Sequence, residues 1–278
     1  MSMAECNLAT GLWDVSNADY HAHDAISHSR LEVFRASPVE FEARYVLGTM
    51  PHPKPSASMI LGTALHVQIM EPEKWDELIS VEPEINGRTN EGKAARAAFA
   101  ESSKGKTVIT KEQSAAVVKM AKSALAHPEV QEIVQNAWKR EQGMRCVSPI
   151  GLPLRAKLDI VCHFPLIADF KSAVDVSPDG FARACATWGY HRQGALYSDV
   201  AKAVLGKSYT FVNIAVQNSE PWECACFVLD KDDIALGRDQ NNRDLARLKE
   251  CYETNEWRGP QNTGIMKLKL PKWASYVE

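Results

Sequence analysis

Apolar and polar residues follow two different periods along this chain, helical in the first half and strand-like in the second. Apolar positions three or four residues apart predict helices in the first half. They fall at 27–45 (a helix pair), 58–70, 110 to about 127, and a short segment before Glu141. Thr110 and Gln113 have the spacing of a capping box, and Pro128 ends that helix. The segment 86–106 is polar and contains glycine around an alanine-rich helical middle, so we expect a mobile loop there.

Short runs of apolar residues separated by turn residues predict strands in the second half. Two runs flank a turn at 149–151 and predict a hairpin, and further runs predict three more strands. The expected strands are 144–148, 153–162, 166–172, 209–217 and 222–229. Ser177 and Pro178 form a strong helix start, and the helical pattern runs to about 205 with a break near Gly189. A final amphipathic helix is expected at 232–254.

The order of these elements predicts a mixed α/β fold, with a mixed sheet and helices before, within and after it. We expect a single domain over 1–278, because the sequence contains no internal repeat and no low-complexity stretch. Within it, 1–130 is expected to be mainly helical, 131–255 to form the mixed-sheet core and 256–278 to form a C-terminal tail.

Composition indicates an ordinary globular protein, since 45% of the residues are hydrophobic and 24% are charged. No apolar run approaches the roughly 18 residues needed to span a bilayer. The N-terminus lacks a basic region followed by an apolar one, so we expect a cytoplasmic protein without a membrane partner. Seven cysteines with no C-x-x-C pair favour reduced thiols over disulfides. An iron–sulfur cluster is disfavoured, because no closely spaced cysteine set could pair with Cys6.

The net charge of −3 does not by itself indicate a nucleic-acid binder. Any DNA-binding surface must be a local basic patch that acidic faces elsewhere offset. Six basic residues flank the expected strands, and the sequence leaves open whether they form such a patch or are ordinary solvated charges. They are Arg140, Arg145, Arg155, Lys157, Arg183 and Arg192.

Three charged residues on the expected strands form the strongest candidate for chemistry. Asp169 and Lys171 alternate on an apolar strand, so both side chains leave the same face, and Asp159 lies on the neighbouring strand. One or two carboxylates and a substrate phosphate suffice to hold Mg²⁺. A lysine beside them can orient the attacking water or offset charge on the phosphate. An exposed hairpin with an ordinary Asp–Lys pair is the alternative, but charges on buried strands need partners or a metal.

An ordered set of motifs resembles the RecB-like branch of the PD-(D/E)XK nucleases, and within it the phage RecE-type (exonuclease VIII-like) exonucleases. The set is Gly62-x-x-x-His66, Asp159, Asp169-x-Lys171 and Gln193-x-x-x-Tyr197. Two further stretches, 26–38 and 88–93, resemble the N-terminal helices and central loop of that family. The likeness extends from about residue 20 to residue 230. It implies a restriction-endonuclease-like core with an N-terminal helical elaboration.

The resemblance also implies roles for individual residues. His66, Asp159 and Asp169 would bind the metal, together with the backbone carbonyl of Phe170. Lys171 would position the attacking water, while Gln193 and Tyr197, on one helix face, would support the site and contact DNA. Glu141 matches a further acidic position by spacing alone. One departure is Lys157-Leu158, where the family usually has Gly or Pro. Oxygen ligands favour Mg²⁺, and a histidine ligand leaves Mn²⁺ open.

The activity that the resemblance implies is a divalent-metal-dependent exodeoxyribonuclease on linear double-stranded DNA. It would digest 5′ to 3′ and leave 3′ single-stranded overhangs for phage-type recombination, as a homo-oligomeric ring with a single-strand annealing protein as partner.

Alternatives are a catalytically inert DNA-binding or assembly protein of the same fold and a structure-specific endonuclease. Intact Asp159, Asp169 and Lys171 disfavour the inert protein, and the lack of a cysteine cluster disfavours a Cas4-like enzyme. A circular-DNA control would test for an endonuclease. The sequence contains no Walker A loop, no G-x-G-x-x-G after a strand and no G-x-S-x-G elbow.

Overall fold

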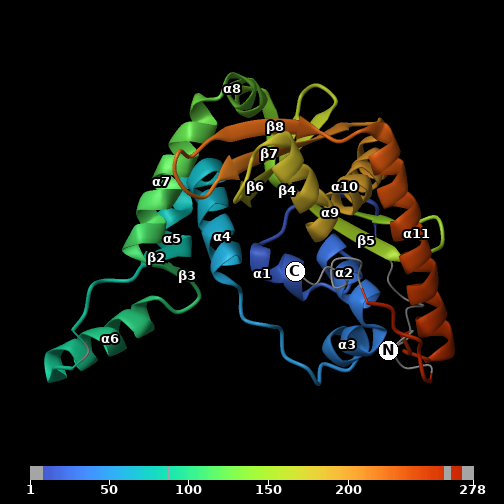
Figure 1. The fold of residues 1–278 in the computed structure, drawn as a ribbon, viewed down its shortest axis with the longest axis horizontal. Coiled ribbons are helices and arrows are strands. Elements are labelled where there is room, and N and C mark those ends of the chain that lie inside the picture. Colours follow the sequence, from blue (N-terminus) through green and yellow to red (C-terminus); the bar gives the residue numbers. More distant parts are fainter. Residues whose placement is uncertain (1–8, 87, 260–263, 271–278) are drawn as a thin grey trace, which may run out of the picture.

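A six-stranded sheet organises the computed structural model, which describes residues 9–86, 88–259 and 264–270 (Figure 1). The strand order is β1-β4-β5-β6-β7-β8. Neighbouring strands are antiparallel except β6 and β7, which are parallel. The strands are β1 (Gly11–Trp13), β4 (Ala137–Val147), β5 (Pro153–Cys162), β6 (Leu166–Ala173), β7 (Thr210–Gln217) and β8 (Cys224–Val228). The predicted mixed α/β fold is therefore confirmed.

Helices cover both faces of this sheet, with α4 and α7 on one side and α10 and α11 on the other (Figure 1). The first-half helices are α1 (Asn17–Ala22), α2 (His28–Ala36), α3 (Pro38–Phe41), α4 (Ala57–Met70), α5 (Trp75–Leu78), α6 (Asn90–Ser102), α7 (Lys111–Ala126) and α8 (Pro128–Gln135). The others are α9 (Pro178–Trp188), α10 (Tyr190–Leu205) and α11 (Lys231–Thr254). A π-helical turn, Glu42–Val46, follows α3, and a 3₁₀ turn, Pro72–Lys74, follows α4. No helix in the described residues is long and apolar enough to cross a membrane.

Of the four apolar clusters in the described residues, the two largest lie between the sheet and its helices. One contains buried residues of α2, α10 and α11, including Phe34, Leu196 and Leu248. The other lies under α4, α7 and α8 and includes Leu65 and Met120. Burial of apolar surface on both faces makes the central strands rigid supports for any side chain that projects from their ends.

Two local sequence signals set the ends of helices as predicted. Thr110 accepts a hydrogen bond from the backbone N–H of Gln113, and the Gln113 side chain accepts one from the N–H of Thr110, which is the capping box. Gly189 has a φ of 71° and ends α9, so the predicted break in the long helical region is confirmed. A left-handed conformation of this kind costs glycine little.

The alanine-rich helical middle expected within 86–106 is confirmed as helix α6, which projects from the body (Figure 1), but the prediction of a loop was wrong because the helix takes up most of the segment. Thr89 caps the helix by accepting a hydrogen bond from the N–H of Gly92. A Cβ on Gly92 would lie 1.9 Å from the carbonyl oxygen of Asn86. The glycine that suggested a loop is therefore required by the turn that starts the helix, and the alanine-rich middle favours the helix.

Strand β4 begins at Ala137, seven residues before the predicted start, because its first half is polar and largely exposed and lacks an apolar pattern. Strand β1, helix α1 and a small parallel pair, β2 (Ile79–Val81) with β3 (Thr107–Ile109), were not predicted. Each is too short to show a periodic pattern. The predicted tail at 256–278 contains no helix or strand where it is described, at 256–259 and 264–270, and its other residues lie outside the described part. The proposed internal boundaries at 130 and 255 stay predictions.

Candidate functional site

The candidate site lies where β5 and β6 separate. These strands pair at Ile160 with Ala168 and at Val161 with Ile167. Asp159 and Asp169 come directly beyond this paired segment, on neighbouring strands. Both carboxylates are therefore held by backbone that is fixed on one side and diverges on the other, which leaves space between the strands for further side chains.

Three side chains gather closely at this point. The candidate ligand atoms of His66, Glu141 and Asp159 all lie within 4.8 Å of one another. His66 Nδ1 is 3.4 Å from Asp159 Oδ2 and 3.7 Å from Glu141 Oε1, while its Nε2 lies 3.1 Å from the carbonyl oxygen of Phe170. Asp159 Oδ2 also accepts a hydrogen bond of 2.7 Å from the N–H of Phe170. The structure thus brings together four groups that the sequence predicted as metal ligands.

His66 lies on helix α4 and Glu141 lies on strand β4. The N-cap Ser56 starts α4, and Leu65 and Ile69 of the same helix pack into the core under the sheet, which fixes the position of His66. Glu141 has a φ of 48°, in the left-handed region that residues other than glycine rarely adopt. Such strain costs on the order of 1–3 kcal/mol and is common at functional sites. Lys157 Nζ holds Glu141 Oε2 at 3.0 Å.

Asp169, Lys171 and Gln193 form a second, adjoining set. Lys171 makes an ion pair with Asp169 Oδ2, and Gln193 Nε2 donates a hydrogen bond of 3.0 Å to Asp169 Oδ1. The side chains of Asp169 and Lys171 therefore share one face of β6, as predicted. Lys171 Nζ also lies 4.8 Å from the ring centre of Tyr190. Asp169 is outside the closely spaced group of His66, Glu141 and Asp159, because both of its oxygens are held by the lysine and the glutamine.

Tyr197 lies one turn after Gln193 on α10 and has a supporting position. Its ring meets Phe211 edge to face, with ring centres 6.1 Å apart. Burial and nearby acidic groups raise the pKa of Tyr197 well above its ordinary value, although Gln193 opposes this by hydrogen bonding. The tyrosine is therefore a neutral side chain that braces the helix face carrying Gln193. Its predicted contact with DNA stays a prediction.

Three carboxylates lie beside the cationic groups of one histidine and two lysines at this site. Burial raises the pKa of Asp159, and the carboxylate of Asp169 raises it further. Burial opposes protonation of His66, but Asp159 and Glu141 raise its pKa to about 9. The imidazole ring is therefore protonated at neutral pH and supplies positive charge to the group, with one N–H directed at Phe170 and the other at the carboxylates.

The donor set fits a hard divalent cation. It offers carboxylate oxygens, a backbone carbonyl and one imidazole nitrogen, which suit Mg²⁺ and, because of the nitrogen, Mn²⁺. Glu141 Oε1 is buried and accepts no hydrogen bond within the described residues, and its charged neighbour is the His66 ring at 3.7 Å, so a cation bound here would take the place of that ring as its partner. A divalent metal can replace the positive charge that protonated His66 now provides.

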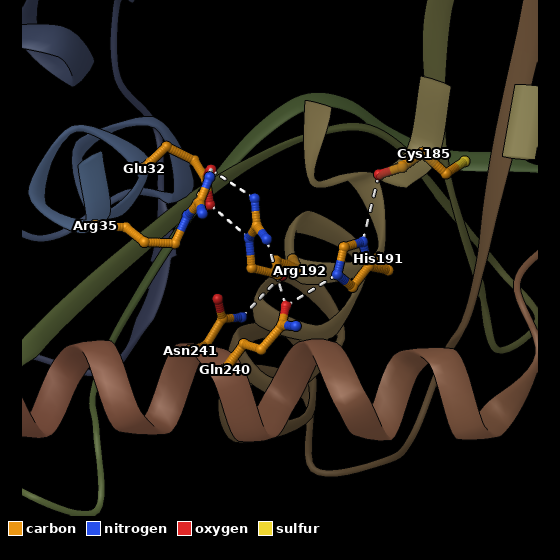
Figure 2. A network of polar contacts seen from close by, with 7 residues as sticks. All are labelled: Glu32, Arg35, Cys185, His191, Arg192, Gln240 and Asn241. Atoms are coloured by element: carbon orange, nitrogen blue, oxygen red, sulfur yellow. Dashed lines mark hydrogen bonds and ion pairs between the residues drawn. The ribbon is translucent and has the colours of Figure 1, made fainter. Parts of the chain in front are cut away.

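Arg192, which the sequence grouped with candidate DNA-binding residues, has a different place (Figure 2). It is buried and forms two hydrogen bonds of 2.6 Å with Glu32 of α2. Its backbone carbonyl accepts a hydrogen bond from Asn241, and Gln240 of α11 bonds both Arg192 and His191. This network fixes α10, and with it Gln193, against two other helices. A single glutamate on a helix gave no signal by which sequence reasoning could have found Glu32.

The remaining basic residues differ in their surroundings. Arg140 and Arg183 are exposed, Lys157 is engaged by Glu141, and Arg145 and Arg155 lie side by side on β4 and β5 with buried guanidinium nitrogens. The six residues do not form one surface patch.

Comparison with known proteins relates this geometry to a family. The model of the family described as "PDDEXK-like domain of unknown function (DUF3799)" matches residues 27–267. Among solved structures, a candidate exonuclease from Eubacterium rectale has a TM-score of 0.64 at 12% identity, over 93% of this chain and 97% of that one. This is a likeness of fold. LHK-Exo in complex with dAMP gives a TM-score of 0.30 at 14% identity, over 71% and 93%, which carries no argument. No curated protein matches the sequence. The predicted PD-(D/E)XK nuclease fold is confirmed.

Proposed function

We propose that this chain, which belongs to the family of PDDEXK-like domains, is a divalent-metal-dependent nuclease. One observation carries the proposal: His66, Glu141, Asp159, Asp169 and Lys171 meet at the separated ends of β5 and β6. Buried carboxylates, strained backbone and a buried lysine in one place are costly for folding. A protein that only binds DNA would have no need of them, so the set supports catalysis.

His66, Glu141 and Asp159, with the carbonyl of Phe170, are the residues that would hold the metal, and Asp169 adjoins them. When bound, a divalent metal lowers the pKa of water and stabilises negative charge on a phosphate. Burial opposes the charge of Lys171, but Asp169 and Asp159 raise its pKa, so the lysine is a cation at neutral pH. We therefore assign Lys171 to orienting the attacking water and offsetting charge on the phosphate.

The finer activity that we propose is exodeoxyribonuclease action on linear double-stranded DNA, 5′ to 3′, which leaves 3′ overhangs for phage-type recombination. The ordered motifs and the fold shared with a candidate exonuclease support this choice. Mg²⁺ is the proposed cofactor, with Mn²⁺ as a substitute. We also propose a homo-oligomeric ring and a single-strand annealing protein as partner. A ring suits a net charge of −3, because basic residues need only line its channel.

The test uses linear duplex DNA labelled at its 5′ or 3′ ends, with Mg²⁺, Mn²⁺ or a chelator. We expect metal-dependent degradation with release of the 5′ label first. Lys171→Ala should abolish it. Lys104→Ala is the matched control, since Lys104 is an exposed lysine paired only with Glu101.

Closed circular duplex separates the alternatives. Degradation of linear DNA alone supports an exonuclease, while cleavage of circles would identify an endonuclease. A folded wild-type protein that binds DNA but cuts neither substrate with either metal would favour the inert binding protein and overturn the proposal.

A further inference from the structure

Arg155 is a buried cation that forms no ion pair within the described residues. Its side chain lies on β5, is 2% exposed and is one of the largest fully buried groups. Its Nε and Nη1 donate no hydrogen bond within the described residues. The guanidinium carbon lies 4.4 Å from the ring centre of Tyr20, a cation–π contact that offsets only part of the lost hydration. Burial lowers the pKa of Arg155 to about 10, so it remains charged at neutral pH.

Two more guanidinium groups lie beside it. Arg145 is the cross-strand partner of Arg155, and its Nε is also buried without a hydrogen bond in the described part of the chain. Arg30 is buried as well; its guanidinium lies 4.6 Å from the ring centre of Tyr45 and 3.8 Å from Asp24, whose side chain is 71% exposed. Like charges opposite one another on a sheet are destabilising. Within the described residues, these three guanidinium groups, called here the basic group, therefore have one exposed carboxylate as their ion-pair partner.

The surroundings of the basic group indicate where the anion approaches. His21 is exposed at the edge of the basic group. Partial burial lowers the pKa of His21, and the positive charges of Arg155 and Lys157 lower it further. Trp13 lies 5.4 Å from the Arg145 guanidinium. The basic group is thus bordered by the rings of Trp13 and Tyr20, and the exposed His21 lies on the same helix as Tyr20.

We propose that Arg30, Arg145 and Arg155 bind a backbone phosphate of the nucleic-acid strand, several nucleotides away from the phosphodiester that is cut. The inference rests on the proposed function and extends it. Guanidinium forks match phosphate oxygens in geometry and charge. Arg155 lies four residues before Asp159 on the same strand, roughly 13 Å away at the rise of a β-strand. Phosphates of one DNA strand advance about 3.4 Å along the helix axis and are further apart through space because the strand winds about that axis, so the bound phosphate lies roughly two to four nucleotides from the cut.

Binding of duplex DNA in a chelator tests the site without cleavage. Arg145→Gln should weaken binding at least tenfold and reduce the slope of log affinity against log salt by about 1. Arg243→Gln on α11 is the matched control, because Arg243 is exposed and bonds only the carbonyl of Asp239. It should change affinity less than twofold. Equal affinity and slope for Arg145→Gln and wild type would overturn the inference.

Duplexes in which one backbone phosphate is replaced by a neutral methylphosphonate identify the phosphate that the basic group binds. For wild type, the neutral substitution should weaken binding most at one position roughly two to four nucleotides from the cut. Arg145→Gln should bind the duplex modified at that position and the unmodified duplex equally. A sensitive position at the strand terminus, or losses of the same size in the variant at every position, would contradict the assignment.

Thermal unfolding separates anion binding from a structural role of Arg155. Inorganic phosphate should raise the melting temperature of wild type above that in chloride of equal ionic strength, and should not do so for Arg155→Met. In chloride, the variant should melt no lower than wild type, because it lacks the unpaired charge. If Arg155→Met melted lower than wild type in chloride, and phosphate did not raise the melting temperature of wild type, Arg155 would have a structural role only and the inference would be refuted.

The outcomes also separate this inference from the proposed function. Metal-dependent cleavage combined with unchanged binding by Arg145→Gln would refute the basic group alone. Absence of cleavage combined with the expected loss of binding would refute the nuclease alone.

Discussion

Gly237 provides a sharp test of how α10 is held. A Cβ at this position of α11 would lie 2.5 Å from the carbonyl oxygen of His191 and 3.0 Å from the backbone nitrogen of Arg192. Backbone atoms cannot rotate away, so Gly237→Ala must push α11 and α10 apart. Overpacking of this kind costs about 1–3 kcal/mol. Alanine returns up to about 1 kcal/mol through its helix propensity. We expect a net loss of roughly 1–2 kcal/mol in the free energy of unfolding.

The matched control is the same substitution in another helix. A Cβ on Gly62 in α4 would meet nothing within 4 Å. Gly62→Ala should therefore stabilise the protein by up to about 1 kcal/mol. Urea unfolding followed by circular dichroism measures both variants. Because Gln193 follows Arg192 on α10, Gly237→Ala should also lower the cleavage rate, by up to about a hundredfold if the helix moves by 1 Å. Equal stabilisation of both variants would refute the close approach of the two helices.

Two other perturbations test the site and its support. Mn²⁺ at ten times its dissociation constant should stabilise wild type by about 1.4 kcal/mol, and Asp159→Asn should remove most of this gain in thermal unfolding; an equal gain would exclude Asp159 as a ligand. Burial raises the pKa of Glu32, but hydrogen bonding and the charge of Arg192 together lower it more, so the net shift is downward. The ionised carboxylate therefore stabilises the fold at pH values above its ordinary pKa of 4.5, and this stabilisation is lost as pH falls through the lower pKa of the folded state. The stability difference between wild type and Glu32→Gln should therefore shrink from pH 5 to pH 3 in urea unfolding, and a constant difference would contradict the ion pair.

The sequence predicted the site correctly where residues of suitable chemistry are spaced at the period of a strand or a helix. Asp169 and Lys171 alternate on an apolar strand, and this spacing alone placed both on one face of β6. Gln193 and Tyr197, four residues apart, fell on one face of α10 for the same reason. Ser177-Pro178 and the Thr110 capping box gave correct helix starts, because these signals act through hydrogen bonds to neighbouring residues.

Sequence reasoning failed where distant contacts decide. Glu141 lies in a polar strand with a left-handed φ, and only its partners His66 and Lys157 explain that conformation. The partnership of Arg192 with Glu32 joins residues 160 positions apart, which no local pattern could reveal. The same applies to Arg155, whose lack of an ion pair within the described residues depends on how β1 and α1 pack around it.

The contact between His66 and the carbonyl of Phe170 also bears on how the protein acquires activity during synthesis. The two residues are 104 positions apart in the chain. A ribosome adds about 5–20 residues per second, so roughly 5–20 s pass between the appearance of the histidine and that of its partner. Gln193 emerges later still, and β7, which pairs with β6 along its whole length, follows it. A growing chain therefore contains the separate parts of the site long before it can assemble them, and an incomplete translation product ending before β7 should be harmless to DNA.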